Sequence, residues 1–173
     1  MKHLLHTLAI SALLVLQSSG QEKLKVYTNE KLNFRMTYPE NWTLQDLKEG
    51  ASVLRLTAPK ENASDTFQET VTISRQPLGA AGSLAAWVQA QTGVLRELCP
   101  DFAITESEAM KISGQDSWSL GYTATVNGTK VTGVRLSTMV DGMVVTGSLL
   151  AQKGKLSVYL PILKSALASV KKQ

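Results

Sequence analysis

Alternating apolar and polar positions predict most of the strands in this 173-residue chain. A two-residue period is typical of strands with one buried face. The segments expected to be strands are 26–28, 33–38, 52–57, 69–75, 109–112, 117–126, 129–140 and 143–150. Asn127-Gly128 and Asp141-Gly142 separate the last three segments, and such pairs favour two-residue hairpin turns. These three strands are therefore expected to form an antiparallel meander.

A 3.6-residue period replaces this alternation in two segments, and each is expected to be an amphipathic helix. The first runs from Leu84 to Leu98, with Ser83 as its N-cap and Pro100 just beyond its end. The second lies between Tyr159 and Val170, with Pro161 in its first turn, where proline is tolerated. Strands followed by a long helix, a meander and a final helix predict an α+β fold with helices covering an antiparallel sheet.

Residues 1–20 have the three-part pattern of a secretory signal peptide. Lys2 provides the positive start, a mostly apolar segment covers 4–16, and small residues occupy 18–20. The alternative is a membrane anchor, but the uninterrupted apolar run from Leu8 to Leu16 is about half the ~20 residues that a spanning helix needs. We therefore expect cleavage after residue 20.

Cleavage predicts a single domain over residues 21–173, a periplasmic or secreted location, and no stable membrane span. The composition fits one globular domain, since 43% of the residues are hydrophobic and 18% are charged. Both histidines, His3 and His6, lie in the expected signal peptide. Without them the chain has no Ser-His-Asp or Cys-His catalysis and no histidine-ligated zinc. We expect no catalytic residues, no metal and no cofactor.

The basic charge of the chain does not indicate a nucleic-acid partner. The net charge is +4, and the expected cleavage removes one lysine. Acidic and basic residues are mixed along the chain, and the only adjacent basic pair is Lys171-Lys172. Nucleic-acid binders usually concentrate positive charge beside a known motif. We therefore expect no nucleic-acid binding.

Two features offer chemistry with more than one interpretation. Cys99 is the only cysteine, so it is either a half-buried apolar residue or a thiol that pairs with another chain. Asp101, Glu106 and Glu108 are either solvated or hold Ca²⁺, which takes oxygen ligands. Glu106 and Glu108 could also form the acid pair of a hydrolase.

Four segments of the chain resemble the PsbP-like family. Residues 34–42, FRMTYPENW, are similar to the family's opening strand, which ends in Tyr-Pro with a Trp shortly after. The helix that follows Ser83 and contains Trp87 is similar to the family's middle helix. Residues 114–122, GQDSWSLGY, resemble its glycine-led strand, and LKSALASV at 163–170 resembles its final helix.

The resemblance covers residues 25–170 and implies an α/β/α sandwich around an antiparallel sheet. One departure is Ser169-Val170, where relatives often have Ser-Phe. The family includes an extrinsic photosystem II subunit, a Ran-binding nuclear-import factor and bacterial envelope proteins. The resemblance therefore implies a binding or assembly role without a common catalytic site. Some photosynthetic relatives hold metal through histidine, which the expected processed chain lacks.

These observations predict an exported, non-enzymatic domain that binds another envelope or secreted protein. The expected binding residues are Trp42, which follows a Pro39 turn, and the hairpin tips at Asn127, Gly128 and Asp141. Tryptophan is frequent among the anchors of protein interfaces, although Trp42 could instead be a core residue. One alternative is a small-ligand carrier with a pocket between the sheet and helix 84–98. Another is the hydrolase with an acid pair.

Overall fold

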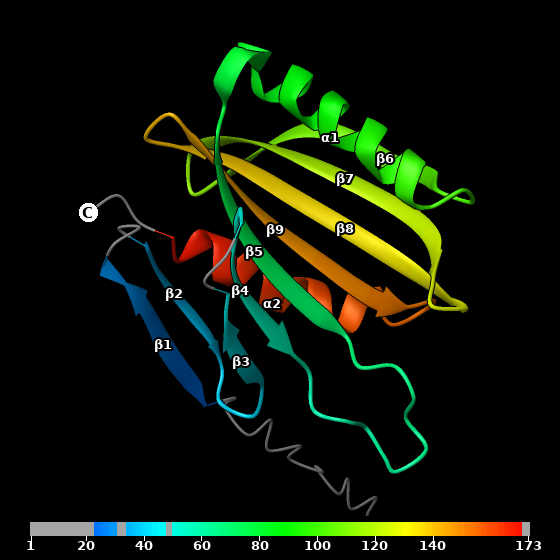
Figure 1. Ribbon diagram of the computed structural model, residues 1–173. Coiled ribbons are helices and arrows are strands. Elements are labelled where there is room, and N and C mark those ends of the chain that lie inside the picture. The colour runs from blue at the N-terminus through cyan, green and yellow to red at the C-terminus, as the bar shows by residue number, and fades with distance from the viewer. Residues whose placement is uncertain (1–22, 31–33, 48–49, 171–173) are drawn as a thin grey trace, which may run out of the picture.

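Seven antiparallel strands form the central sheet (Figure 1). The computed structural model describes residues 23–30, 34–47 and 50–170. In spatial order the strands are β3 (Thr43–Asp46), β4 (Ser52–Thr57), β5 (Thr70–Pro77), β9 (Met143–Gln152), β8 (Thr129–Val140), β7 (Gln115–Val126) and β6 (Ala103–Ile112). The four strands β6 to β9 are sequential neighbours, so each pairs with the next through a short turn.

Two helices cover opposite faces of this sheet. Helix α1 (Leu84–Leu98) packs on β7 and β8, whereas α2 (Leu156–Ala168) packs on β9 and β8. Neighbouring residues of β9 mark the two faces, since Val144 contacts the cluster around Trp87 of α1 and Val145 belongs to the cluster around Leu163 of α2. Figure 1 shows α1 along the β6 to β8 half of the sheet.

A separate hairpin completes the layer that contains α2. Strand β1 (Leu24–Asn29) pairs with β2 (Phe34–Pro39), and β2 packs beside α2. The backbone N–H of Thr37 donates to Ser169 Oγ at 3.0 Å, which ties β2 to the end of the helix. The molecule is therefore an α/β/α sandwich around an antiparallel sheet, as the resemblance to the PsbP-like family implies.

The predicted hairpin turns are confirmed by their backbone conformation. Asn127 and Gly128 have φ of 49° and 79°, and Asp141 and Gly142 have φ of 52° and 72°. Two successive positive φ values are required by type I′ turns, which asparagine, aspartate and glycine tolerate best. These two turns connect β7 to β8 and β8 to β9, so the last three strands form the expected meander.

Three local predictions are corrected by the structure. Residues 43–46 form β3, which the sequence pattern did not predict, and β6 occupies all of 103–112 rather than 109–112 alone. Pro161 was expected in the first turn of its helix but is the sixth residue of α2. Proline removes the hydrogen bond to the carbonyl four residues earlier. That carbonyl belongs to Ser157, which is exposed, so water can replace the missing donor.

The expected signal peptide lies outside the described residues. Within 23–30, 34–47 and 50–170, no helix has the length and apolar character needed to cross a membrane.

Candidate functional site

Trp42 is a core residue and not an exposed anchor. Its side chain is 6% exposed, and its indole packs edge-to-face on Tyr159 of α2, with ring centroids 5.9 Å apart. Burying an indole removes a large apolar area from water and stabilises the fold. The interpretation of Trp42 as a surface anchor is therefore wrong, and the core interpretation is confirmed.

The hairpin tips are exposed but lie at opposite ends of the sheet. Asn127 and Gly128 precede β8, and Asp141 follows it. A strand rises about 3.3 Å per residue, so the twelve residues of β8 separate the two tips by roughly 40 Å. The structure thus does not combine Asn127, Gly128 and Asp141 into one site, and a binding role at either tip stays a prediction.

The acidic residues singled out from the sequence do not converge on a cavity. Glu106 and Glu108 are exposed on β6, an edge strand of the sheet. Asp101 instead fixes the entry to β6, because its carboxylate accepts hydrogen bonds from the Thr125 hydroxyl at 2.6 Å and the Thr125 amide at 2.9 Å. These two bonds lower the pKa of Asp101. Among the described residues, no cluster of histidine, cysteine, aspartate or glutamate could hold a metal ion.

Glu69, the residue immediately before β5, carries a buried carboxylate that the sequence pattern did not single out. Glu69 is 0% exposed, and its Oε1 accepts a hydrogen bond from the backbone N–H of Gln152 at 3.4 Å. Lys155 Nζ lies 3.7 Å from the same oxygen and 2.9 Å from Glu61 Oε2. Tyr159 donates to Glu61 Oε1 at 3.1 Å. We call Glu61, Glu69, Lys155 and Tyr159 the lysine–glutamate cluster.

The electrostatics of the lysine–glutamate cluster favour a structural role. The hydrogen bond between Lys155 and Glu61 raises the pKa of Lys155 and lowers the pKa of Glu61. Burial, followed by the charge of Glu69, raises the pKa of Tyr159. A lysine and a tyrosine with raised pKa values keep their protons at neutral pH, so neither is an activated base or nucleophile. The cluster attaches the loop before β5 to the start of α2.

A cavity of about 310 Å³ lies between part of α1 and the sheet. We call it the α1 cavity. Its floor consists of polar side chains from β5, β8 and β9, and Trp87, Gln91, Leu95 and Cys99 close it from the α1 side. Cys99 is half-buried there, as one of its two interpretations predicts. A second hollow runs along the other flank of α1, where Arg96, Ser107 and Trp118 line it.

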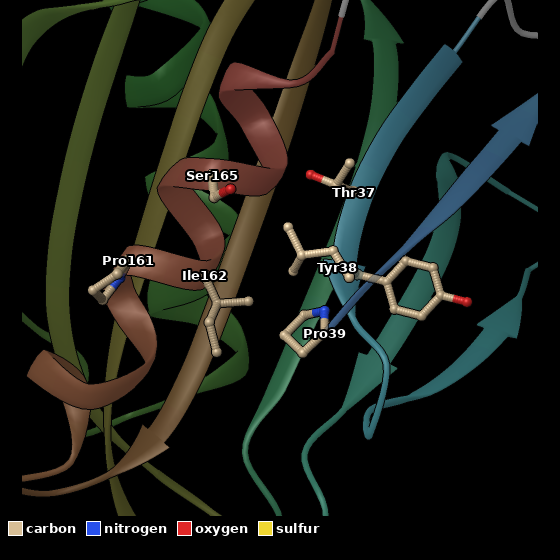
Figure 2. A pocket seen from close by; sticks show the side chains of 7 residues that line it. Thr37, Tyr38, Pro39, Pro161, Ile162 and Ser165 are labelled. Atoms are coloured by element: carbon tan, nitrogen blue, oxygen red, sulfur yellow. The ribbon is translucent and has the colours of Figure 1, made fainter. Parts of the chain in front are cut away.

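An apolar groove of about 270 Å³ lies on the opposite side of the molecule, between the β1–β2 hairpin and α2. We call it the hairpin groove. Figure 2 shows Ile162 extending from α2 toward Pro39 of β2, with Pro161 beside it and the Tyr38 ring directed away from the helix. Leu24 of β1 also lines the groove. Nothing in the sequence pattern predicted this groove, because it forms between two segments far apart in the chain.

Comparison with known proteins yields structural matches alone. No protein-family model matches the sequence, and no curated protein matches it. Cyanobacterial PsbP from Synechocystis sp. PCC 6803 is 16% identical with a TM-score of 0.63, over 90% of this chain and 96% of that chain. LpqN of Mycobacterium tuberculosis, described as involved in cell envelope biogenesis, is 14% identical with a TM-score of 0.56, over 86% and 83%.

The Ran-binding protein Mog1p of Saccharomyces cerevisiae is also similar. It is 11% identical with a TM-score of 0.56, over 86% of this chain and 87% of that chain. Likenesses at these identities establish the fold. The chain therefore has the PsbP-like fold, which the resemblance at residues 34–42 and 114–122 implied.

Proposed function

We propose that this protein is a non-enzymatic, exported binding domain that docks onto another protein of the cell envelope through the hairpin groove. The observation that carries this proposal is the exposed apolar surface around the groove. Leu24, which lines it, is 57% exposed. Val26 shares a face of β1 with Leu24 and is 52% exposed. Val158 lies one helical turn before Ile162 and is 65% exposed.

Such a surface fits a protein partner better than a small solute. Contiguous exposed apolar side chains on a monomer commonly mark interaction sites. The groove between β2 and α2 receives an apolar side chain of the partner. Leu24, Val26 and Val158 then contact the partner's surface around that side chain. A buried apolar anchor surrounded by other contacts is the arrangement that concentrates binding energy in protein interfaces.

The structural neighbours and the N-terminal sequence support the same proposal. One neighbour is described as Ran-binding and another as involved in cell envelope biogenesis. The signal-peptide pattern of residues 1–20 favours export, which would place the domain among envelope or secreted proteins.

Matched surface variants test the proposal. The groove variant Leu24→Lys/Val158→Lys changes two exposed residues beside the groove, and the control Val94→Lys/Leu98→Lys changes two exposed residues of α1. Each is used to capture proteins from the cell envelope that the unmodified protein retains. The proposal predicts one stoichiometric partner that the groove variant loses at least about tenfold and the control retains. Equal capture by both variants would contradict it.

The two alternative functions differ in their structural support. The hydrolase hypothesis has none from Glu106 and Glu108, which line none of the cavities described above. The carrier hypothesis is favoured by one observation. It requires a pocket between the sheet and helix 84–98, and the α1 cavity lies there.

A further inference from the structure

The floor of the α1 cavity contains one arginine. Arg135 projects from β8 on the face that α1 covers, and its register partners are Leu120 on β7 and Ser148 on β9. Its Nε is buried and has no hydrogen-bond partner in the described part of the chain. None of the ion pairs formed by the described residues includes Arg135. A guanidinium has five N–H donors and is always charged, so a buried, unpartnered N–H is costly to retain.

Hydroxyl groups continue the polar floor beside Arg135. Ser148 lies opposite Arg135 on β9, and Thr72 lies opposite Ser148 on β5. Thr146 and Ser74 are also register partners, two residues along the same strands from Ser148 and Thr72. Side chains that are direct register partners lie on the same face of a sheet. Two adjacent strands, β5 and β9, therefore present hydroxyl groups next to the guanidinium on β8.

The rest of the lining is mixed, since Ser52, Gln76 and Gln91 are polar and the other side chains are mainly apolar, and no acid is among the described residues that line the cavity. Trp87 and Leu95 come from α1, while Tyr122 and Leu150 come from β7 and β9. Arg135 is the only charged residue among the described residues that line the cavity. A volume of about 310 Å³ is at the lower end of the range for small-molecule sites.

We propose that the α1 cavity binds a small monocarboxylic acid with an apolar body. The guanidinium of Arg135 pairs with the carboxylate, since arginine and carboxylate match in charge and in planar geometry. Ser148 and Thr72 donate to the remaining carboxylate lone pairs. Trp87, Leu95 and the other apolar residues enclose the body of the molecule. A single arginine compensates one negative charge, which favours a monoanion over a phosphate dianion.

This inference is independent of the docking proposal, because the cavity and the hairpin groove lie on opposite faces of the sheet. The probes are 3-phenylpropionate, octanoate and the neutral 3-phenylpropanamide, titrated into the purified protein by calorimetry. We expect an acid to bind at least about tenfold more tightly than the amide, because the neutral amide cannot form the ion pair with Arg135. Arg135→Gln should lose this preference. The matched control Arg96→Gln, on the other flank of α1, should keep it.

A second measurement uses the unmodified protein, in case Arg135→Gln does not fold. The backbone amide signals of Thr72 and Ser148 in NMR spectra should shift with 3-phenylpropionate and not with the amide. Cys99, at the cavity wall, should react more slowly with a thiol reagent when the acid is bound. Equal affinity for acid and amide, unchanged binding by Arg135→Gln, or no binding of either acid at millimolar concentration would overturn the proposal.

Discussion

The ring of Tyr122 lies directly over Gly133 on the neighbouring strand. A β-carbon at Gly133 would be 2.1 Å from Tyr122 Cζ, which is far inside van der Waals contact. The two residues are register partners on β7 and β8, so the glycine leaves the space that the phenol ring occupies. The ring of Phe102 also packs on Tyr122, with the two ring centroids 5.0 Å apart. This packing positions one wall of the α1 cavity.

Gly133→Ala is therefore expected to destabilise the protein. The added methyl group must displace the Tyr122 ring, and overpacking of this kind typically costs about 1–3 kcal/mol. Urea denaturation of the variant and the unmodified protein measures the change in the free energy of unfolding. An unchanged midpoint would mean that the ring does not lie over Gly133.

Gly93→Ala provides the opposite expectation on a glycine with free space around it. Gly93 lies inside α1, and a β-carbon there meets no other atom within 4 Å. Replacing a helix-interior glycine by alanine reduces the entropy lost on folding, which should stabilise the protein by about 0.5–1 kcal/mol. The same urea experiment measures this gain. A loss of stability would show that α1 packs differently around residue 93.

Trp42→Ala is expected to lower the free energy of unfolding by a large fraction of its total. The buried indole contacts the Tyr159 ring, and removing such a side chain usually costs about 3–5 kcal/mol. Trp42→Phe keeps an aromatic ring and should cost clearly less. Thermal denaturation compares the two variants. If Trp42→Ala kept full stability, Trp42 would be a surface residue, as the anchor interpretation assumed.

Asp101 predicts a defined dependence of stability on pH. Its hydrogen bonds to Thr125 lower its pKa in the folded state below the value of about 3.9 that an unfolded aspartate has. A lowered folded pKa contributes stability above the unfolded pKa, and that contribution is lost as the pH falls through the folded pKa. Asp101→Asn should therefore be less stable than the unmodified protein near neutral pH. The difference should disappear as the pH falls well below 3.9.

Denaturation midpoints across the acidic range measure this difference. Asp116→Asn is the control, since the pKa of Asp116 is also lowered, by an exposed ion pair with Lys111. Exposed pairs are screened by salt, so the effect of Asp116→Asn should vanish at high ionic strength, whereas that of Asp101→Asn should largely persist. A pH-independent deficit for Asp101→Asn would contradict the assignment.

Local patterns predicted the parts of the fold that are determined locally. Helix α1 begins after Ser83, whose hydroxyl accepts from the Ala86 amide at 3.2 Å, and ends at Leu98 as the sequence indicates. Strand β3 was missed because its four residues are mostly exposed and show no alternation. Its existence depends on pairing with β4. Strand β6 was recognised only in part for a similar reason, since it is an edge strand in which all but two residues are exposed.

The candidate sites were harder to predict because tertiary packing creates them. The burial of Trp42 depends on Tyr159 in the final helix, and the hairpin groove joins β1 and β2 to the same helix. Two polar residues could have been noticed from strand parity. Glu69 shares the inward phase of Val71 and Ile73, and Arg135 shares a phase with Val131, which packs beneath α1. Which of these positions would face a cavity depends on where α1 lies.

Site-specific photo-crosslinking in intact cells tests the docking proposal most directly. A photoreactive residue replaces Val158 beside the hairpin groove, and a matched one replaces Lys60, an exposed residue in the loop between β4 and β5. The account predicts an adduct with one envelope protein from position 158 that is absent from position 60 and is lost when Leu24→Lys is added. No adduct from position 158, or the same adduct from both positions, would contradict it.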